Sequence, residues 1–482
     1  MCYPAPALSR APRSAQRTRH TAQPPTGSRP TNPKGHTVST PSRPPTPPPS
    51  TSRYGVASVV GNALEWYDFF LYATAASIVF GPLFFPTTGD PLIGTLASLA
   101  GLTVGFMARP LGGVIFGHIG DRFSRRSALV ATLAIMGVAT FAIGLLPTYE
   151  TAGVLAPALL VVLRVLQGTA AGGEWGGAVL MISENVPAER RGFLSAWSQA
   201  GLALGFVLSS GVFLLTQVML GDEAFLAWGW RVPFLVSVVV VGAGIYIRFR
   251  IPAEHGGHDT SAQDAPPRLP VVEVFRTQRR SLLLAMALRV AENGGSYIFL
   301  TFALVYGKHV GVPQELLLLG VMTSMTAAIG TMLFFGHLSD RVGRGPVYLG
   351  GATGLALLAF PFFWMIDTGM PAVVLLAFFL GNGLCHAAMI GTQPAFFTEL
   401  FSREVRYSGL SLAHELAAVF AGGLSPLIAT ALLATTGSSV PVALYVIGLA
   451  LVTIVALLVT WRSAGLTGRR PGPAVRDPEP AR

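Results

Sequence analysis

The sequence predicts an all-α membrane protein whose twelve transmembrane helices form two six-helix halves. Three observations predict this fold. The composition is the first, since 51% of the 482 residues are hydrophobic, 12% are charged and 55 are glycine, which is too apolar for a soluble chain of this length. Second, apolar runs of roughly 20 residues, the length needed to span about 30 Å of hydrocarbon, recur along the chain. Third, the sequence GHIGDR at 117–122 returns as GHLSDR at 336–341, which indicates a duplicated bundle.

A second pair of residues supports the duplication. Glu184 and Arg191 follow a long apolar run, and Glu399 and Arg406 follow another with the same spacing. Because both features recur in the same order, we place six spans in each half. The predicted spans are 55–82, 91–117, 127–147, 153–184, 192–219, 229–249, 281–307, 313–336, 346–367, 370–400, 408–434 and 440–461.

The formal net charge of +10 is concentrated in the first 53 residues. They hold eight Lys/Arg and no Asp or Glu, so +10 minus +8 leaves about +2 for the rest, which argues against a nucleic-acid-binding protein. Their 13 prolines oppose a packed core, and they lack the apolar segment of a signal peptide. We therefore expect a disordered cytoplasmic tail over 1–53.

Basic loops set the predicted orientation. Arginines gather in the loops at 118–126, 185–191, 337–345 and 401–407, whereas the alternate loops offer little beyond Lys308. The positive-inside rule then places both termini in the cytoplasm. We expect the protein to lie in the inner membrane of the cell. The predicted organisation is a first bundle at 54–249, a cytoplasmic connector at 250–280, a second bundle at 281–462 and a short disordered tail at 463–482.

Acidic residues in the first span suggest proton coupling. Glu65, Asp68 and Tyr72 share one face with Asn62, and a charge at bilayer depth costs from about 2.5 kcal/mol upward. Two partly desolvated carboxylates one turn apart suit a proton carrier. The alternative is that both stay ionised and pair with arginines as structural contacts.

Arg164 of the fourth span is the predicted anchor for a substrate anion. It lies roughly 16 Å into the helix, and a planar guanidinium can bind a carboxylate with two hydrogen bonds. Gln167 and Glu174 share its broad face. An internal ion pair of Arg164 with Glu174 or Asp68 is the competing interpretation.

The seventh and tenth spans offer further polar groups. Arg289, Glu292, Asn293 and Tyr297 follow one another at helical spacing in the seventh span, where Arg289 is either a ligand group or a structural one. His386 and Gln393 lie on one stripe of the tenth span, although a lone histidine on an apolar helix is usually a packing residue. His414 and Glu415 are adjacent in the eleventh span, so we expect them on different faces.

A third group of charged residues belongs to the repeated loops. We expect Arg109 to snorkel to the membrane surface or to pair with Asp121. Asp121 and Asp340 are expected to accept the helix N-terminus of the opposite half and to pair with arginine, as a latch that breaks when the bundle rocks. The predicted gating residues are Arg109, Asp121, Arg122, Arg125, Asp340, Arg341 and Arg344.

The sequence lacks the motifs that are typical of other functional classes. The chain has no G-x-x-x-x-G-K-[ST] loop, which argues against an ATP-driven pump, and no nucleophile–base constellation, which argues against an enzyme. Its two cysteines, Cys2 and Cys385, predict neither a disulfide framework nor a metal site. We expect a monomer that uses no cofactor and is driven by a proton gradient.

Five separated motifs resemble the metabolite:proton symporter family of the major facilitator superfamily, namely GNALEWYDFFLY (61–72), RPLGGVIFGHIGDR (109–122), QGTAAGGEWGGA (167–178), WGWRVPFL (228–235) and ELFSREVRYSG (399–409). That family includes carriers of shikimate, 2-oxoglutarate, citrate, and proline or betaine. The resemblance covers about residues 55–462 and implies the two-half fold, proton coupling and alternating access. By position, its motifs include Glu65, Asp68, Arg164, Glu174, Asp121 and Arg122.

Two departures from the family pattern stand out. Ser124 replaces a glycine that the second copy keeps at Gly343, and His414-Glu415 replaces Tyr followed by Gln or Asn. The interpretation is a proton-driven symporter that imports a small carboxylated metabolite, shikimate- or dicarboxylate-like. A proline/betaine-type osmolyte:proton symporter is the alternative, followed by an exporter or a transporter-like receptor.

Overall fold

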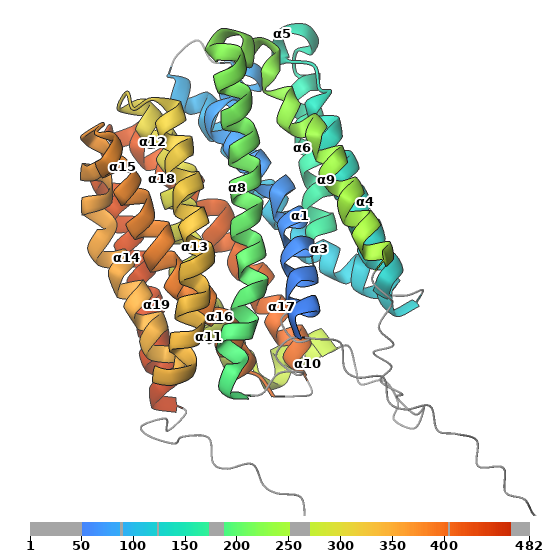
Figure 1. The fold of residues 1–482 in the computed structure, drawn as a ribbon, viewed down its shortest axis with the longest axis vertical. Helices are drawn as coiled ribbons and strands as arrows, with labels where there is room; N and C mark the ends of the chain where they lie inside the picture. The colour runs from blue at the N-terminus through green and yellow to red at the C-terminus, as the bar shows by residue number, and fades with distance from the viewer. Residues whose placement is uncertain are drawn as a thin grey trace, which may run out of the picture. The chain divides into compact units, whose positions relative to one another are not determined.

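The computed structural model describes residues 51–86, 90–122, 125–172, 188–250, 270–402 and 405–463, which form long helices packed side by side (Figure 1). The predicted twelve-helix fold in two halves is confirmed, because the described part of each predicted span coincides with one helix or with consecutive helical segments. Residues 173–184 of the fourth predicted span lie outside the described residues. Seven helices of the described residues, some built from consecutive helical segments, are long and apolar enough to cross a membrane, judged by length and composition. We call each long continuous helix or run of helical segments a rod. Most of the predicted tails and residues 251–269 of the predicted connector lie outside the described residues.

The first half contains six long rods. Pro91 and Gly221 mark two of their limits, because proline is favoured in the first helical turn and Gly221 has a φ of 75° near the end of its helix, a conformation that favours glycine. The short helix α5 (Tyr149–Ala152) precedes the fourth rod. The rods are α1 (Thr51–Ile78) with α2 (Phe80–Phe84), α3 (Pro91–Arg122), α4 (Arg125–Gly144), α6 (Leu155–Ala171), α8 (Arg191–Ala224) and α9 (Arg231–Arg250).

The second half follows the connector helix α10 (Pro270–Thr277). Three of its rods contain a π-helical segment, named η3, η4 and η6. Such segments shift the angular position of the side chains that follow them and often occur at functional sites. The rods are α11 (Arg279–Tyr297) with η3 (Ile298–Phe302) and α12 (Ala303–His309), α13 (Gln314–Val342), α14 (Arg344–Asp367), α15 (Pro371–Phe378) with η4 (Phe379–His386) and α16 (Ala387–Thr398), α17 (Arg406–Ala417) with η6 (Ala418–Gly423) and α18 (Leu424–Thr436), and α19 (Val440–Ser463).

Glycines allow α3 and α6 to touch at the backbone, as small residues do in many membrane bundles. A Cβ added at Gly112 would overlap the backbone carbonyl of Thr169, and one added at Gly168 would overlap that of Gly105. A Cβ at the neighbouring Gly113 would meet no atom within 4 Å. This contact therefore fixes how closely α3 approaches the helix that carries Arg164.

We expect Gly112→Ala to lower the stability of the purified protein by about 1–3 kcal/mol, because overpacking against rigid backbone forces the helices apart. Gly113→Ala is the matched control, since it adds the same methyl group to open space and gains helix propensity. Thermal unfolding in detergent measures both variants. Equal stability of the two would contradict the close α3–α6 contact.

The two halves meet along α8 and α13, which run side by side (Figure 1). At one end of α8, the Asp340 carboxylate accepts the backbone N–H groups of Gly192 and Phe193, at 2.8 and 2.9 Å. At the other end, Gln217 Nε2 donates to Glu315 Oε1 at 3.1 Å. The halves are thus bonded at both ends of this helix pair, and we call the end that holds Asp340 the inner end.

Because the Asp340 carboxylate bonds one half to the other, we expect the conformation at the inner end to change when its charge is removed. Asparagine retains one acceptor oxygen but loses the favourable interaction with the N-terminus of α8, worth about 1–2 kcal/mol. We expect Asp340→Asn to raise the reactivity of cysteines placed at the inner end. Glu189→Gln, which removes an exposed acid just before α8, serves as control, and labelling of Asp340→Asn equal to that control would contradict a latch.

Candidate substrate and proton site

A small cavity lies between the two halves. About 20 Å³ remains free inside it, enough for one or two water molecules and far below the 300–1,000 Å³ of ligand pockets. The residues that line it come from α1, α8, α11, η3, η4, α16 and α17. They are Trp66, Phe70, Gln199, Leu202, Phe206, Arg289, Glu292, Asn293, Ser296, Tyr297, Leu300, His386, Ile390, Gln393 and His414.

Five of the eight residues predicted to bind substrate line this cavity, namely Arg289, Asn293, Tyr297, His386 and Gln393. Sequence reasoning missed Gln199 and the three aromatic residues Trp66, Phe70 and Phe206. A glutamine inside the apolar run of α8 is a signal that the sequence did contain. The aromatic residues gave no comparable signal, because apolar rings are common throughout membrane helices.

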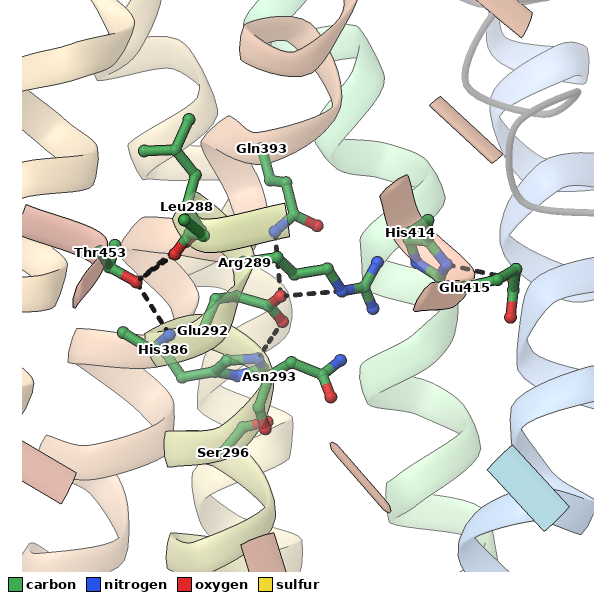
Figure 2. A network of polar contacts seen from close by, with 12 residues as sticks. Leu288, Arg289, Glu292, Asn293, Ser296, His386, Gln393, His414, Glu415 and Thr453 are labelled. Atoms are coloured by element: carbon green, nitrogen blue, oxygen red, sulfur yellow. Dashed lines mark hydrogen bonds and ion pairs between the residues drawn. The ribbon is translucent and has the colours of Figure 1, made fainter. Parts of the chain in front are cut away.

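A buried polar network forms the second-half wall of the cavity (Figure 2). Glu292 is at its centre, with Oε2 3.6 Å from Arg289 Nε and Oε1 3.2 Å from His386 Nε2. Gln393 Nε2 donates to Glu292 Oε2 at 2.9 Å. Both oxygens of the carboxylate therefore have partners, as a buried charge requires.

Several polar atoms of the same wall have no hydrogen-bond partner among the described residues. They are Asn293 Oδ1, Tyr297 Oη and His386 Nδ1. A buried polar group without a partner costs free energy, so these atoms are suited to bind a polar molecule that enters the cavity. His386 is the last residue of the π-helical segment η4, and η3 begins directly after Tyr297.

A second buried ion pair joins the halves and corrects one prediction. Arg109 Nε of α3 lies 2.6 Å from Glu415 Oε2 of α17, and with 2% of the residue exposed Arg109 does not snorkel to the membrane surface. The side chain of Asp121, its other predicted partner, lies outside the described residues. His414 lines the cavity whereas Glu415 is not among its lining residues, as expected for neighbours on different faces, and His414 Nδ1 lies 3.2 Å from Glu415 Oε1. The side chains meet because each is long enough to bend toward the other.

Arg164 lies outside the cavity wall. Its guanidinium carbon is 4.3 Å from the ring centroid of Phe69 and 4.2 Å from that of Tyr72, a cation–π arrangement. Nη1 donates to Gln167 Oε1 at 3.2 Å, and the absence of a side chain at Gly105 makes room for the guanidinium. Arg164, Gln167 and Tyr72 thus form a cluster inside the first half. The alternative ion pair with Asp68 is not formed among the described residues, and Glu174 lies outside them.

Asp68 is completely buried in α1. Neither carboxylate oxygen has a hydrogen-bond partner among the described residues. The nearby Thr140 hydroxyl donates its proton to Met136 O and accepts from Gln167 Nε2. A buried carboxylate without hydrogen bonds costs free energy when it is ionised.

The remaining predicted residues divide into two groups. Asp340 and Arg344 join the inner end, where Arg344 Nη1 lies 2.8 Å from Glu399 Oε1, and Arg341 is exposed. The side chains of the others lie outside the described residues. These are Glu65, Asp121, Arg122, Arg125 and Glu174.

Comparisons with known proteins agree with this architecture. Residues 59–426 match the sequence model of the Major Facilitator Superfamily. The chain is 40% identical to the shikimate transporter of Escherichia coli K12 over 84% of this chain and 93% of that protein. It is 33% identical to the proline/betaine transporter of the same strain over 88% of this chain and 86% of that protein. A crystal structure of a D-xylose–proton symporter superposes with a TM-score of 0.65 at 17% identity, over 85% of this chain and 96% of the other.

Proposed function

This chain belongs to the major facilitator superfamily and is a multi-pass membrane transporter, and from that premise we propose that it is a proton-coupled symporter that imports a small carboxylated metabolite. The observation that carries the proposal is Arg289 on the wall of the central cavity. Only 3% of Arg289 is exposed, and its Nε atom lies 3.6 Å from Glu292 Oε2. A planar guanidinium on the cavity wall can bind a substrate carboxylate with two hydrogen bonds.

The other wall residues favour a substrate that also carries hydroxyl groups. Asn293 and Tyr297 supply an acceptor and a phenol without partners, and Gln199 faces them from the first half. Trp66 and Phe206 supply apolar faces on the opposite side. A compact ring with one carboxylate and several hydroxyls fits this distribution, in keeping with the 40% identical shikimate transporter.

The proton is assigned to carboxylates that have no fixed cationic partner. Asp68 is the best supported of these, because it is buried and its oxygens have no hydrogen-bond partner among the described residues. Glu292 is less suited, since three side chains hold it. Glu65 and Glu174 stay as sequence-based candidates. The protein would work by alternating access as a monomer in the inner membrane, with both termini cytoplasmic and without ATP or a cofactor.

A zwitterionic osmolyte is the second candidate, and the aromatic residues of the cavity favour it. Trp66 and Phe70 are stacked with centroids 5.1 Å apart, and aromatic faces bind quaternary ammonium groups. The relatives that transport proline and betaine point the same way. Such a substrate would place its carboxylate on Arg289 and its cationic end against the rings.

An uptake screen with purified protein in liposomes tests the proposal. Organic acids, hydroxylated ring carboxylates, proline and betaine would each be offered with an imposed inward proton gradient. We expect saturable accumulation of a carboxylate that stops when a protonophore is added. Accumulation of betaines alone would favour the second candidate, and accumulation that the protonophore leaves unchanged would contradict proton coupling.

A further inference from the structure

His386 differs from the other residues of the cavity wall because one of its two ring nitrogens is bonded and the other is not. The residue ends η4, lines the cavity and is buried. Its Nε2 lies 3.2 Å from Glu292 Oε1, a contact that Figure 2 shows, while Nδ1 is buried without a hydrogen-bond partner among the described residues. A buried polar atom without a partner costs free energy, so a ligand that supplies a partner for Nδ1 gains affinity.

The contacts of Glu292 decide which ring nitrogen of His386 carries the hydrogen. Oε2 of Glu292 accepts a hydrogen bond from Gln393 Nε2 at 2.9 Å and lies 3.6 Å from Arg289 Nε, so these neighbours stabilise the ionised carboxylate. An ionised carboxylate only accepts hydrogen bonds. We therefore assign the hydrogen of the imidazole to Nε2, which donates it to Oε1 of Glu292.

The other nitrogen, Nδ1, is then an acceptor only. Arg289 already balances the negative charge of Glu292, and a second buried cation beside it would lack a counter-charge, so the site favours the neutral imidazole. With its hydrogen on Nε2, a neutral imidazole has only a lone pair on Nδ1. By contrast, the amide of Asn293 and the hydroxyl of Tyr297 can each present a donor or an acceptor. Of these three wall residues, His386 is the one whose unpartnered atom requires a donor from the ligand.

We propose that His386 is a specificity-determining residue that recognises one hydroxyl group of the substrate. Its Nδ1 accepts the hydrogen of this hydroxyl, while the substrate carboxylate binds Arg289 of α11, which packs against η4. Glu292 contributes to both contacts, because it holds the guanidinium and keeps the imidazole hydrogen on Nε2. This role rests on the proposed carboxylate transport and deepens it, since it distinguishes a hydroxylated acid from an acid that has no hydroxyl to donate.

The proposed role also separates the two candidate classes of substrate. A ring carboxylate with hydroxyl groups can donate a hydrogen to Nδ1 of His386. Betaine has a carboxylate and a quaternary ammonium group, and it carries no hydrogen on nitrogen or oxygen that it could donate. A site built to bind a hydroxyl rejects a ligand without one, because its buried polar atom then stays unpaired. Loss of the Nδ1 acceptor should therefore weaken binding of a hydroxylated acid and leave binding of betaine unchanged.

Two substitutions of His386 separate recognition of the ligand from support of Glu292. Glutamine can place an amide N–H near the position of Nε2, so His386→Gln keeps the donor to Glu292 and loses the acceptor at Nδ1. Asparagine can place its amide oxygen near the position of Nδ1, so His386→Asn keeps the acceptor and loses the donor to Glu292. His309→Gln, at the exposed end of α12, is the matched control.

The probes are shikimate and the analogues that each lack one of its ring hydroxyls, titrated into the purified full-length protein. We expect the unchanged protein and His309→Gln to bind one analogue at least about fivefold more weakly than shikimate. In His386→Gln this ratio of dissociation constants should fall to within about twofold. His386→Asn should keep a ratio above about threefold, and thermal unfolding shows that each variant is folded.

An unchanged ratio in folded His386→Gln would overturn the proposed role, because glutamine would then replace a residue that serves only to support Glu292. So would equal binding of shikimate and every analogue by the unchanged protein, a result that depends on no variant. Both outcomes leave the proposed carboxylate transport standing. Binding of neither shikimate nor any analogue would instead overturn the proposed function for ring carboxylates, and the role of His386 with it.

Discussion

Replacing Arg289 by lysine is expected to weaken binding of the transported carboxylate by about 1–3 kcal/mol, which is roughly five- to 150-fold in dissociation constant. Lysine keeps the positive charge but loses the planar fork that binds two carboxylate oxygens. Arg289→Ala should bind more weakly still, because the guanidinium that balances the negative charge of the substrate is then removed from that wall. Isothermal titration of the purified variants with the substrate found in the uptake screen measures both effects.

Two controls separate binding from folding in this experiment. Arg279→Lys changes an exposed arginine at the start of the same helix, and we expect it to bind as the unchanged protein does. Thermal unfolding of the Arg289 variants should shift less than binding, because His386 and Gln393 still hold Glu292. Unchanged affinity in folded Arg289→Ala would remove this residue from the site and would weaken the case for an anionic substrate.

The second large effect is expected at Asp68. Asp68→Asn should abolish accumulation driven by a pH gradient, which for one proton is worth a factor of about ten per pH unit, while exchange of labelled for unlabelled substrate continues. The amide has nearly the shape of the carboxylic acid but cannot release a proton. Accumulation and exchange measured in the same proteoliposomes give both quantities.

Glu223→Gln, an exposed substitution near the end of α8, is the control for this measurement. Full accumulation by Asp68→Asn would show that another acid carries the coupled proton, and Glu65 and Glu174 would be tested next.

The sequence was sufficient to predict the fold because the twelve apolar runs and the repeated loop are local features. The residues of α11 and η4–α16 that line the cavity could also be predicted, since polar groups in an apolar helix must face the protein interior. Arg289, Glu292 and His386 belong to this group. Their mutual contacts required the structure, because α11 and η4 are distant in sequence.

Two placements could not be predicted, for a physical reason. Arg164 was expected in the cavity, but α6 is apolar around much of its surface, so the pattern does not specify which way the helix is rotated. Its guanidinium lies instead between Phe69 and Tyr72. The Arg109–Glu415 pair depends on where α3 meets α17, and no local signal encodes a contact between halves.

The central claim is that a carboxylate and a proton enter together, and counting both fluxes in one preparation tests it most directly. Substrate added outside weakly buffered proteoliposomes should make the external solution more alkaline, in fixed proportion to the substrate taken up. Asp68→Asn should exchange substrate without this alkalinisation. Substrate uptake by the unchanged protein with no accompanying proton movement would contradict the account.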